Sequence, residues 1–251
     1  MMRIVTRPAD TTMPTIAANS TERCAQRVKQ IWKQADCVCF DVDSTVCRDE
    51  AIDELARYLG VGDAVAQVTR QAMNGNARFR DALSARLDVM RPSRDQVEGF
   101  KKENPPKMTP GIVELVKALH ARSVSVYLVS GGFRSLIEPV AAILGIPKIN
   151  IYANQLLYNA DGSYAGFDEN ELTSDSGSKE VGKPGVCGLL KSQHGYRNLV
   201  MIGDGATDLE AAPPANAFIG FGGNQVRESV RSQADWFVND FDVLRKELDA
   251  Q

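Results

Sequence analysis

The feature of this sequence that most constrains its fold is an apolar run, Cys37 to Phe40, that stops abruptly on two carboxylates, Asp41 and Asp43. An apolar run of this kind is typical of a strand buried in a sheet. Because side chains alternate between the faces of a strand, Asp41 and Asp43 should point to the same side. Ligands of open α/β sheets bind just beyond the carboxyl ends of the strands. The run therefore predicts the first strand of such a sheet, with a carboxylate pair at its ligand-binding edge.

Two carboxylates in one small space repel each other unless their charge is compensated. Either a cation lies between Asp41 and Asp43 or one of them holds a proton, and both arrangements are useful in catalysis. A simpler interpretation is that the stretch from Asp41 to Thr45 is a polar turn that caps the next helix. For an isolated pair of aspartates the simpler interpretation is the more common one, so the ends of the other strands must decide.

The second predicted strand, 124–129, also ends on polar residues. Ser130, Gly131 and Gly132 follow it and precede a helix. A hydroxyl group and the backbone N–H groups of two glycines in this position are suited to binding an anionic oxygen. The position of the motif at the end of a second strand is what makes it informative.

The predicted strand 199–203 delivers a third carboxylate, Asp204, to the same edge. Together with the first pair it forms a cluster of hard oxygen ligands that suits Mg²⁺. Lys183 precedes Pro184 and the start of a helix, where its ammonium group and the helix dipole would both favour an anion. The sequence therefore predicts a site for a metal ion and a phosphate-like anion.

Between the first two strands the sequence predicts four helices, which would form a small inserted bundle. Their segments are 50–59, 63–74, 76–90 and 93–103. A unit inserted at this point would hang over the carboxyl edge of the sheet and exclude water from it. Glu50, Met73 and Arg86 are the candidates to face the sheet, although charged residues on helices are often only solvated.

We therefore expect three parts of the chain. Residues 21–48 and 105–251 form an α/β core, residues 49–104 a helical cap, and residues 1–20 a flexible tail. Ser20 is predicted to cap a helix that runs to Ala35, and Thr109 with Pro110 to start another. The remaining predicted strands are 149–153, a hairpin of 156–158 with 164–167, 217–222 and 236–238.

Composition excludes several classes of partner. The chain has 251 residues and a formal net charge of −3, so it has no excess of positive charge for binding nucleic acid. No apolar stretch approaches the ~20 residues that span a bilayer, so no membrane contact is expected. Five cysteines, two of them in the predicted first strand, favour free thiols in a reducing compartment and hence a cytoplasmic location.

In order and spacing, four motifs of the chain resemble those of the haloacid dehalogenase (HAD) superfamily of phosphotransferases. They are Phe40 to Thr45, Ser130 to Gly132, the lysine before a helix, and Gly203 to Asp208. Over residues 21–248 the chain is further similar to the members that hydrolyse O-phospho-L-serine, through the segments Glu50 to Leu55, Thr69 to Met73 and Ala217 to Asn224. The resemblance implies a Rossmann-like parallel sheet with helices on both faces and an inserted helical cap.

The resemblance also implies a role for each candidate residue. Asp41 would be the nucleophile that forms an aspartyl-phosphate, and Asp43 would be the general acid and then the general base. Mg²⁺ would be held by Asp41, the Asp43 backbone carbonyl and Asp204. Asp208 would orient Lys183 or the metal shell. In the cap, Glu50 would contact the substrate ammonium and Arg86 its carboxylate, and Met73 and Asn74 would close over the substrate. The groups of the core expected to contact the substrate are Ser130, Gly131, Gly132, Lys183 and Thr207.

Two positions depart from the usual pattern of the family. The family's Ser-Gly-Gly-Lys is replaced here by Ser-Gly-Ser-Lys ending at Lys179, and Lys183 follows after a short insertion. Either lysine could contact the phosphate, and the helix start favours Lys183. Asn74 stands where the family usually has glycine, so a backbone contact with the substrate there is less expected.

Three functions have to be compared. A phosphatase for O-phospho-L-serine, acting in the last step of serine biosynthesis, needs both Glu50 and Arg86 to bind its small-molecule substrate. A related phosphatase for another small phosphomonoester would need only the strand-end motifs. A receiver-type phospho-acceptor module would use a similar acidic pocket with Mg²⁺ but leave it open, which the helical insert disfavours. A homodimer is implied by the resemblance alone.

Overall fold

The computed structural model describes the backbone of residues 15–74 and 78–249, and the side chains of residues 22–72 and 78–249. In this part of the chain six strands form one parallel sheet in the order β3-β2-β1-β6-β7-β8. The strands are β1 (Cys37–Phe40), β2 (Ser125–Phe133), β3 (Ile151–Asn154), β6 (Leu199–Gly203), β7 (Ala217–Phe221) and β8 (Trp236–Val238). This is the order of a doubly wound Rossmann sheet, whose ligand crevice lies where the direction of winding reverses. The predicted α/β sheet is confirmed.

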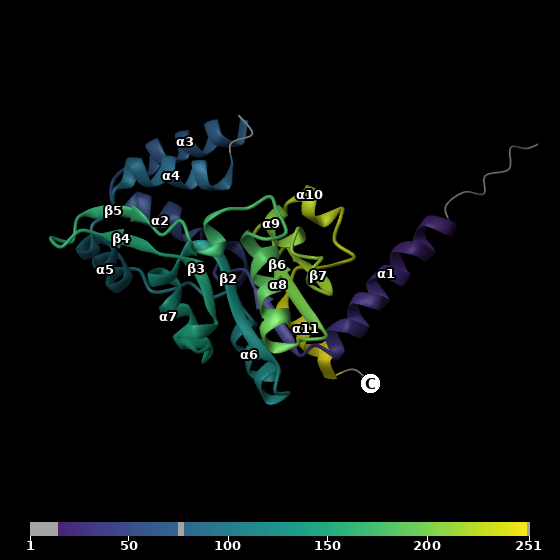
Figure 1. The fold of residues 1–251 in the computed structure, drawn as a ribbon. Coiled ribbons are helices and arrows are strands. Elements are labelled where there is room, and N and C mark those ends of the chain that lie inside the picture. Colours follow the sequence, from purple (N-terminus) through teal and green to yellow (C-terminus); the bar gives the residue numbers. More distant parts are fainter. Residues whose placement is uncertain (1–14, 75–77, 250–251) are drawn as a thin grey trace, which may run out of the picture.

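Helices cover both faces of the sheet (Figure 1). One face is covered by α1 (Thr15–Lys33), α6 (Ile112–Ala121), α7 (Arg134–Leu144) and α11 (Phe241–Asp249). The other is covered by α8 (Gly182–His194), α9 (Ala206–Leu209) and α10 (Glu228–Arg231). None of the described helices combines the length and the apolar character needed to cross a lipid bilayer.

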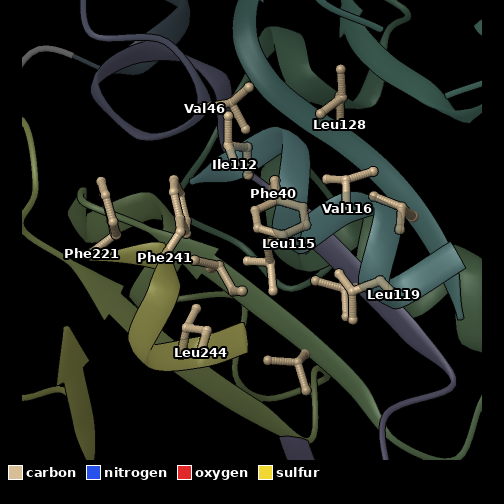
Figure 2. Packing of buried hydrophobic residues seen from close by; sticks show 14 of the residues in the cluster. Phe40, Val46, Ile112, Leu115, Val116, Leu119, Leu128, Phe221, Phe241 and Leu244 are labelled. Carbon is tan, nitrogen blue, oxygen red and sulfur yellow. The ribbon is translucent and has the colours of Figure 1, made fainter. Parts of the chain in front are cut away.

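The alternation of side chains along β1 connects the two apolar layers. Val38 and Phe40 point into the larger cluster, where the Phe40 ring lies edge-on to Phe241 of α11 (Figure 2). Cys37 and Cys39 point into the second cluster, beneath α8. All four residues are fully buried, because the strand has helices on both sides.

The segment between β1 and α6 forms the four predicted helices. They are α2 (Ala51–Tyr58), α3 (Gly62–Asn74), α4 (Phe79–Met90) and α5 (Arg94–Glu103). Their apolar faces build a third cluster, which also contains Leu156 and Phe167 from the antiparallel hairpin of β4 (Leu156–Tyr158) and β5 (Tyr164–Phe167). The hairpin therefore packs with the cap helices, and the exact division at residues 49 and 104 stays a prediction.

Two predicted helix starts are wrong. Helix α1 begins at Thr15, so Ser20 lies inside it and does not cap it. The division of the chain at residue 20 stays a prediction. Ile, Ala and Ala at positions 16–18 are compatible with a helix and extend it toward the N-terminus. Helix α6 begins at Ile112, after Gly111 with a φ of 81°. Thr109 instead donates from Oγ1 to the Thr45 carbonyl at 2.7 Å, which ties it to the loop that follows β1.

Candidate active site

The strand registers bring the polar strand ends to one edge of the sheet. Because Phe40 pairs with Leu128 on one side and with Ile202 on the other, the residues that follow these three reach the same edge. Asp41 continues the pairing, since its N–H donates to the Ile202 carbonyl at 2.9 Å. Together with the cap helices, this edge encloses a cavity of about 540 Å³.

Asp41 lies in this cavity beside a buried lysine. Its Oδ1 accepts a hydrogen bond from the N–H of Val42 at 2.8 Å and lies 2.9 Å from Nζ of Lys183, near the start of α8. Lys183 Nζ also donates to Oδ1 of Asp208 at 2.5 Å. Burial alone would lower the pKa of Lys183, but Asp208 and Asp41 more than offset it and raise the pKa. A fixed positive charge therefore lies against Asp41.

Asp43 both caps a helix and lines the cavity. Its Oδ1 accepts a hydrogen bond at 2.9 Å from the N–H of Ala51, the first residue of α2, as the simpler interpretation of the motif predicted. The same residue lines the cavity. Burial, together with the charges of Glu50 and Asp41, raises the pKa of Asp43 to about 8. A proton on this carboxyl group is therefore favoured at neutral pH, which suits a general acid.

The Ser-Gly-Gly motif lies within β2, which continues to Phe133 instead of ending at residue 129 as predicted. Ser130 Oγ accepts a hydrogen bond from the Gly132 N–H at 2.9 Å. A Cβ atom at Gly132 would lie 3.1 Å from Oδ2 of Asp43, and one at Gly131 would lie 2.6 Å from Cζ of Phe79. A side chain at either position would crowd Asp43 or Phe79, so the glycines allow a close approach of the backbone and leave a concave surface of hydroxyl and N–H donors suited to an anion.

Asp204, at the end of β6, lines the cavity floor, and Asp208 of α9 lies buried behind it. Asp208 is fully buried and accepts a second hydrogen bond, at 2.9 Å, from the Gly205 N–H. A Cβ atom at Gly203 would lie 2.1 Å from Cγ of Asp208, so this position requires glycine. Burial and the neighbouring Asp41 raise the pKa of Asp204, although Arg227 opposes them. The floor therefore carries more negative than positive charge.

Three carboxylates at or just behind the floor could hold a metal ion. Asp41, Asp204 and Asp208 are buried and place one oxygen each within 4.8 Å of the others. Carboxylate oxygens in this arrangement suit a hard divalent cation, and the raised pKa of Asp204 is consistent with a place for added positive charge. Because Asp41 and Asp204 line the cavity and Asp208 does not, Asp41 and Asp204 are the better candidates for direct ligands.

The cap contributes one acidic and one basic residue to the cavity. Glu50, which precedes α2, accepts a hydrogen bond from Ser44 Oγ at 2.8 Å. Arg86 of α4 donates from Nε to the Ala82 carbonyl of its own helix at 3.2 Å. Burial raises the pKa of Glu50 and lowers that of Arg86, so both charges are incompletely solvated. A ligand with an ammonium and a carboxylate group would compensate both.

Arg227 is a site residue that the sequence analysis missed. Its Nε donates to Asp204 Oδ2 at 2.8 Å, and its Nη2 donates to Glu50 Oε1 at 3.3 Å. It therefore bridges the floor of the cavity and the cap. The segment Ala217 to Asn224 carries part of the resemblance, but nothing in the sequence indicates that a residue after it returns to the cavity.

Asn224 is a second residue whose role only the fold reveals. Its Nδ2 donates to the Ser44 carbonyl at 3.0 Å and to Thr109 Oγ1 at 2.7 Å. It also lies 3.3 Å from the Cys47 carbonyl. One amide group therefore holds the loop that carries Asp43 and Glu50 against the core.

The remaining predicted residues fall into three cases. Thr207 lines the cavity. Lys179 is exposed in the loop before α8 and is not among the residues that line the cavity, whereas Lys183 is. Met73 and Asn74 end α3, and their side chains lie outside the described residues.

Fold and site together define a class of enzyme. A Rossmann-type sheet presents aspartates, a buried lysine and backbone donors in one cavity beneath a helical cap. Fixed donors of this kind stabilise charge on a transferring phosphoryl group, and a carboxylate beside them can accept that group. The class is therefore a phosphoryl-transferring hydrolase with an aspartate nucleophile.

Comparison with known proteins agrees with this class. A family model, haloacid dehalogenase-like hydrolase, matches residues 35–216. The chain is 53% identical to a phosphoserine phosphatase of Rattus norvegicus and 52% identical to one of Homo sapiens, each over 222 residues that cover 88% of this chain and 97% of the relative. A solved structure described as a phospho-aspartyl intermediate analogue of phosphoserine phosphatase matches with a TM-score of 0.67 at 27% identity, covering 86% of this chain and 98% of that one.

The chain belongs to the haloacid dehalogenase-like hydrolase family. The fold class predicted from the sequence is thereby confirmed, down to the type of sheet. Phosphatases of this family use a divalent metal ion, which agrees with the cluster of Asp41, Asp204 and Asp208.

Proposed function

We propose that this protein hydrolyses O-phospho-L-serine to L-serine and phosphate, the last step of serine biosynthesis, with Mg²⁺ as its metal ion. The observation that carries the proposal is the distribution of charge in one cavity, with anion-binding groups on the sheet edge and Glu50 with Arg86 on the cap. Phosphoserine has the three complementary groups, a phosphate, an ammonium and a carboxylate. The similarity to relatives described as phosphoserine phosphatases supports the same substrate.

The side chains of Asp41 and Asp204, with the backbone carbonyl of Asp43, would hold Mg²⁺. When bound, the ion supplies positive charge that lets a carboxylate approach the anionic phosphate group. Mg²⁺ takes few protein carboxylates and accepts phosphate oxygens, which fits a floor where Asp208 is already bonded to Lys183.

In the first step an oxygen of Asp41 would attack phosphorus. The bond from phosphorus to Asp41 forms while the bond from phosphorus to the serine oxygen breaks, and the protonated Asp43 gives its proton to that oxygen. Ser130 and Lys183 hold the phosphoryl oxygens as negative charge develops on them. Lys183 is suited to this because its two carboxylate partners keep it charged.

In the second step water would hydrolyse the aspartyl-phosphate. Asp43, now ionised, takes a proton from the water as the water oxygen bonds to phosphorus, and the bond from phosphorus to Asp41 breaks. Phosphate leaves and Asp41 returns as a carboxylate. Asp43 is thereby restored to its protonated form for the next substrate.

The cap would select the substrate and exclude bulk water. Glu50 would bind the ammonium group, and Arg86 would bind the carboxylate group through two parallel N–H donors. A phosphomonoester that lacks either group loses one of these two charged contacts, which costs affinity. Sugar phosphates should therefore be poor substrates.

A phosphate-release assay on a graded set of esters tests the proposal. We expect O-phospho-L-serine to be turned over with the highest kcat/KM, O-phosphoethanolamine, which lacks the carboxylate, less well, and glucose 6-phosphate least. Dialysis against a chelator should abolish turnover, and Mg²⁺ should restore it. Equal kcat/KM for all three esters would instead support a phosphatase for another small ester. A stable phosphoprotein without phosphate release would support a receiver-type module.

We also propose a reducing, cytoplasmic setting. All five cysteines are free, and four of them are buried, so no structural disulfide depends on an oxidising compartment. The homodimer expected from the resemblance stays a prediction.

A further inference from the structure

Arg80, on the first turn of α4, makes several contacts between the cap and the core. Its Nη2 donates to the Glu169 carbonyl at 3.1 Å and to Ser174 Oγ at 3.0 Å, and its Nη1 donates to Glu169 Oε2 at 3.4 Å. Its Nε lies 3.7 Å from Asp175 Oδ2. All three partners belong to the segment 168–176, between β5 and α8. Arg80 itself is not among the residues that line the cavity.

The segment that Arg80 contacts is bonded to the proposed phosphate site. Thr173 Oγ1 donates to Asn154 Oδ1 at 3.0 Å, and Asn154 Nδ2 donates to the Gly131 carbonyl at 2.8 Å. Both Thr173 and Asn154 are buried, so this connection is shielded from water. The position of Arg80 on the segment 168–176 therefore sets the position of α4 relative to Gly131.

Phe79, the residue before Arg80, packs against Gly131 of the proposed phosphate site. The ring of Phe79 packs so closely over Gly131 that a Cβ atom there would lie 2.6 Å from it. The third apolar cluster forms the larger attachment, because it joins the cap helices to Phe133, to Leu136 and to the β4–β5 hairpin, and Phe79 packs against it. The cap is therefore attached to the core through this extended apolar cluster and, at Arg80, through a small set of polar contacts.

The contacts of Arg80 with the segment 168–176 can break and form again at low cost. The Arg80 side chain is 32% exposed, so water can replace its partners when they separate. Its Nε is buried and has no hydrogen-bond partner among the described residues. Asp175 Oδ2, at 3.7 Å, is within reach of a small shift that would complete the contact. The apolar cluster has no such replacement by water, so it stays attached when the contacts of Arg80 separate.

We propose that Arg80 is a positioning residue that latches the cap onto the segment 168–176 in the closed state. It thereby sets the affinity for substrate without touching the substrate. This inference rests on the proposed function for its kinetic consequence only. A protein whose binding-competent closed state is less populated binds its ligand more weakly in the same proportion.

The kinetic test compares Arg80→Met and Arg80→Lys with a matched control, Arg70→Met, at an exposed arginine of α3. We expect Arg80→Met to raise KM for O-phospho-L-serine about tenfold, with kcat unchanged or higher, because the closed fraction falls. Arg80→Lys should lie between, because one ammonium group cannot reproduce the fork of Arg80. Arg70→Met should leave both constants within twofold of the unmodified protein. A loss of kcat at constant KM in Arg80→Met, or an equal effect of Arg70→Met, would overturn the latch.

A second measurement requires no substrate. Hydrogen exchange of the backbone amides in residues 168–176 should be faster in Arg80→Met than in the unmodified protein and unchanged in Arg70→Met. Unchanged exchange in folded Arg80→Met, or in Arg80→Lys if the first variant does not fold, would overturn the latch. If the unmodified protein does not hydrolyse O-phospho-L-serine, the proposed function fails while this exchange measurement still decides whether Arg80 latches the cap.

Discussion

The cavity has two walls that differ in how rigidly they hold their polar and charged groups. The sheet wall carries Asp41, Ser130 and Lys183, and the cap wall carries Glu50 and Arg86. On the sheet wall Lys183 is 7% exposed and contacts two carboxylates, and Ser130 is 1% exposed. On the cap wall the Glu50 side chain is 38% exposed, although Ser44 and Arg227 donate to it. Among the described residues Arg86 donates only to Ala82 of its own helix. Groups that stabilise developing charge act best when they need not reorganise, whereas groups that admit a substrate must be able to move. We therefore expect the residues of the sheet wall to perform the chemistry and those of the cap wall to select the substrate.

The largest effect should come from removing the nucleophile on the sheet wall. Asp41→Asn keeps the size of the side chain but not its charge, so we expect kcat to fall at least about a thousandfold for every ester. The measurement is phosphate release by a variant whose fold is verified by circular dichroism. Turnover at an undiminished rate would show that the sheet wall does not perform the proposed chemistry.

The next largest effect should separate the two lysines. Lys183→Met removes a charge that lies against Asp41, so we expect a loss of about 10²-fold to 10³-fold in kcat. Lys179→Met is the control, because Lys179 is exposed away from the cavity, and we expect its kcat to stay within twofold. If Lys179→Met lost more kcat than Lys183→Met, we would conclude that Lys179, in the loop before α8, contacts the phosphate.

Substitutions on the cap wall should have smaller and substrate-specific effects. Glu50→Gln and Arg86→Lys each weaken one contact with the serine part of the substrate, so we expect kcat/KM for O-phospho-L-serine to fall about 10-fold to 100-fold. For p-nitrophenyl phosphate, which has neither an ammonium nor a carboxylate group, the change should be below threefold. Equal losses on both substrates would mean that the cap residues serve the chemistry and not the choice of substrate.

The smallest effect is a difference between two pH profiles. Asp43 has a pKa raised to about 8, so its proton is present below that pH and is lost above it. A bound cation lowers this pKa, so kcat/KM for O-phospho-L-serine should fall at or below that value as the pH rises. p-Nitrophenolate leaves without a proton, so the same decline should be absent for p-nitrophenyl phosphate. Parallel profiles for the two esters would remove Asp43 from the role of general acid.

Much of the fold followed from local patterns in the chain. The apolar run before Asp41 predicted the central strand, and the segment 93–103 was predicted as a helix. The structure has α5 there, and Ser93 and Gln96 cap its start with two reciprocal hydrogen bonds. Helix starts were predicted less well at Ser20 and Thr109, because capping residues are common and tertiary contacts decide which of them begins a helix. Thr109 illustrates this, since its hydroxyl bonds to the loop after β1 instead.

The sequence by itself determined the kinds of groups that reach the strand ends, because side-chain alternation and the polarity of a strand end are set within a few residues. Only the tertiary structure decided which lysine lies beside Asp41, that Arg227 joins Asp204 to Glu50, and that Arg80 reaches Ser174. Arg80 and Arg227 are 94 and 23 residues from the residues they contact, Ser174 and Asp204. Contacts of this kind depend on how whole elements pack, and no local pattern in the chain carries that information.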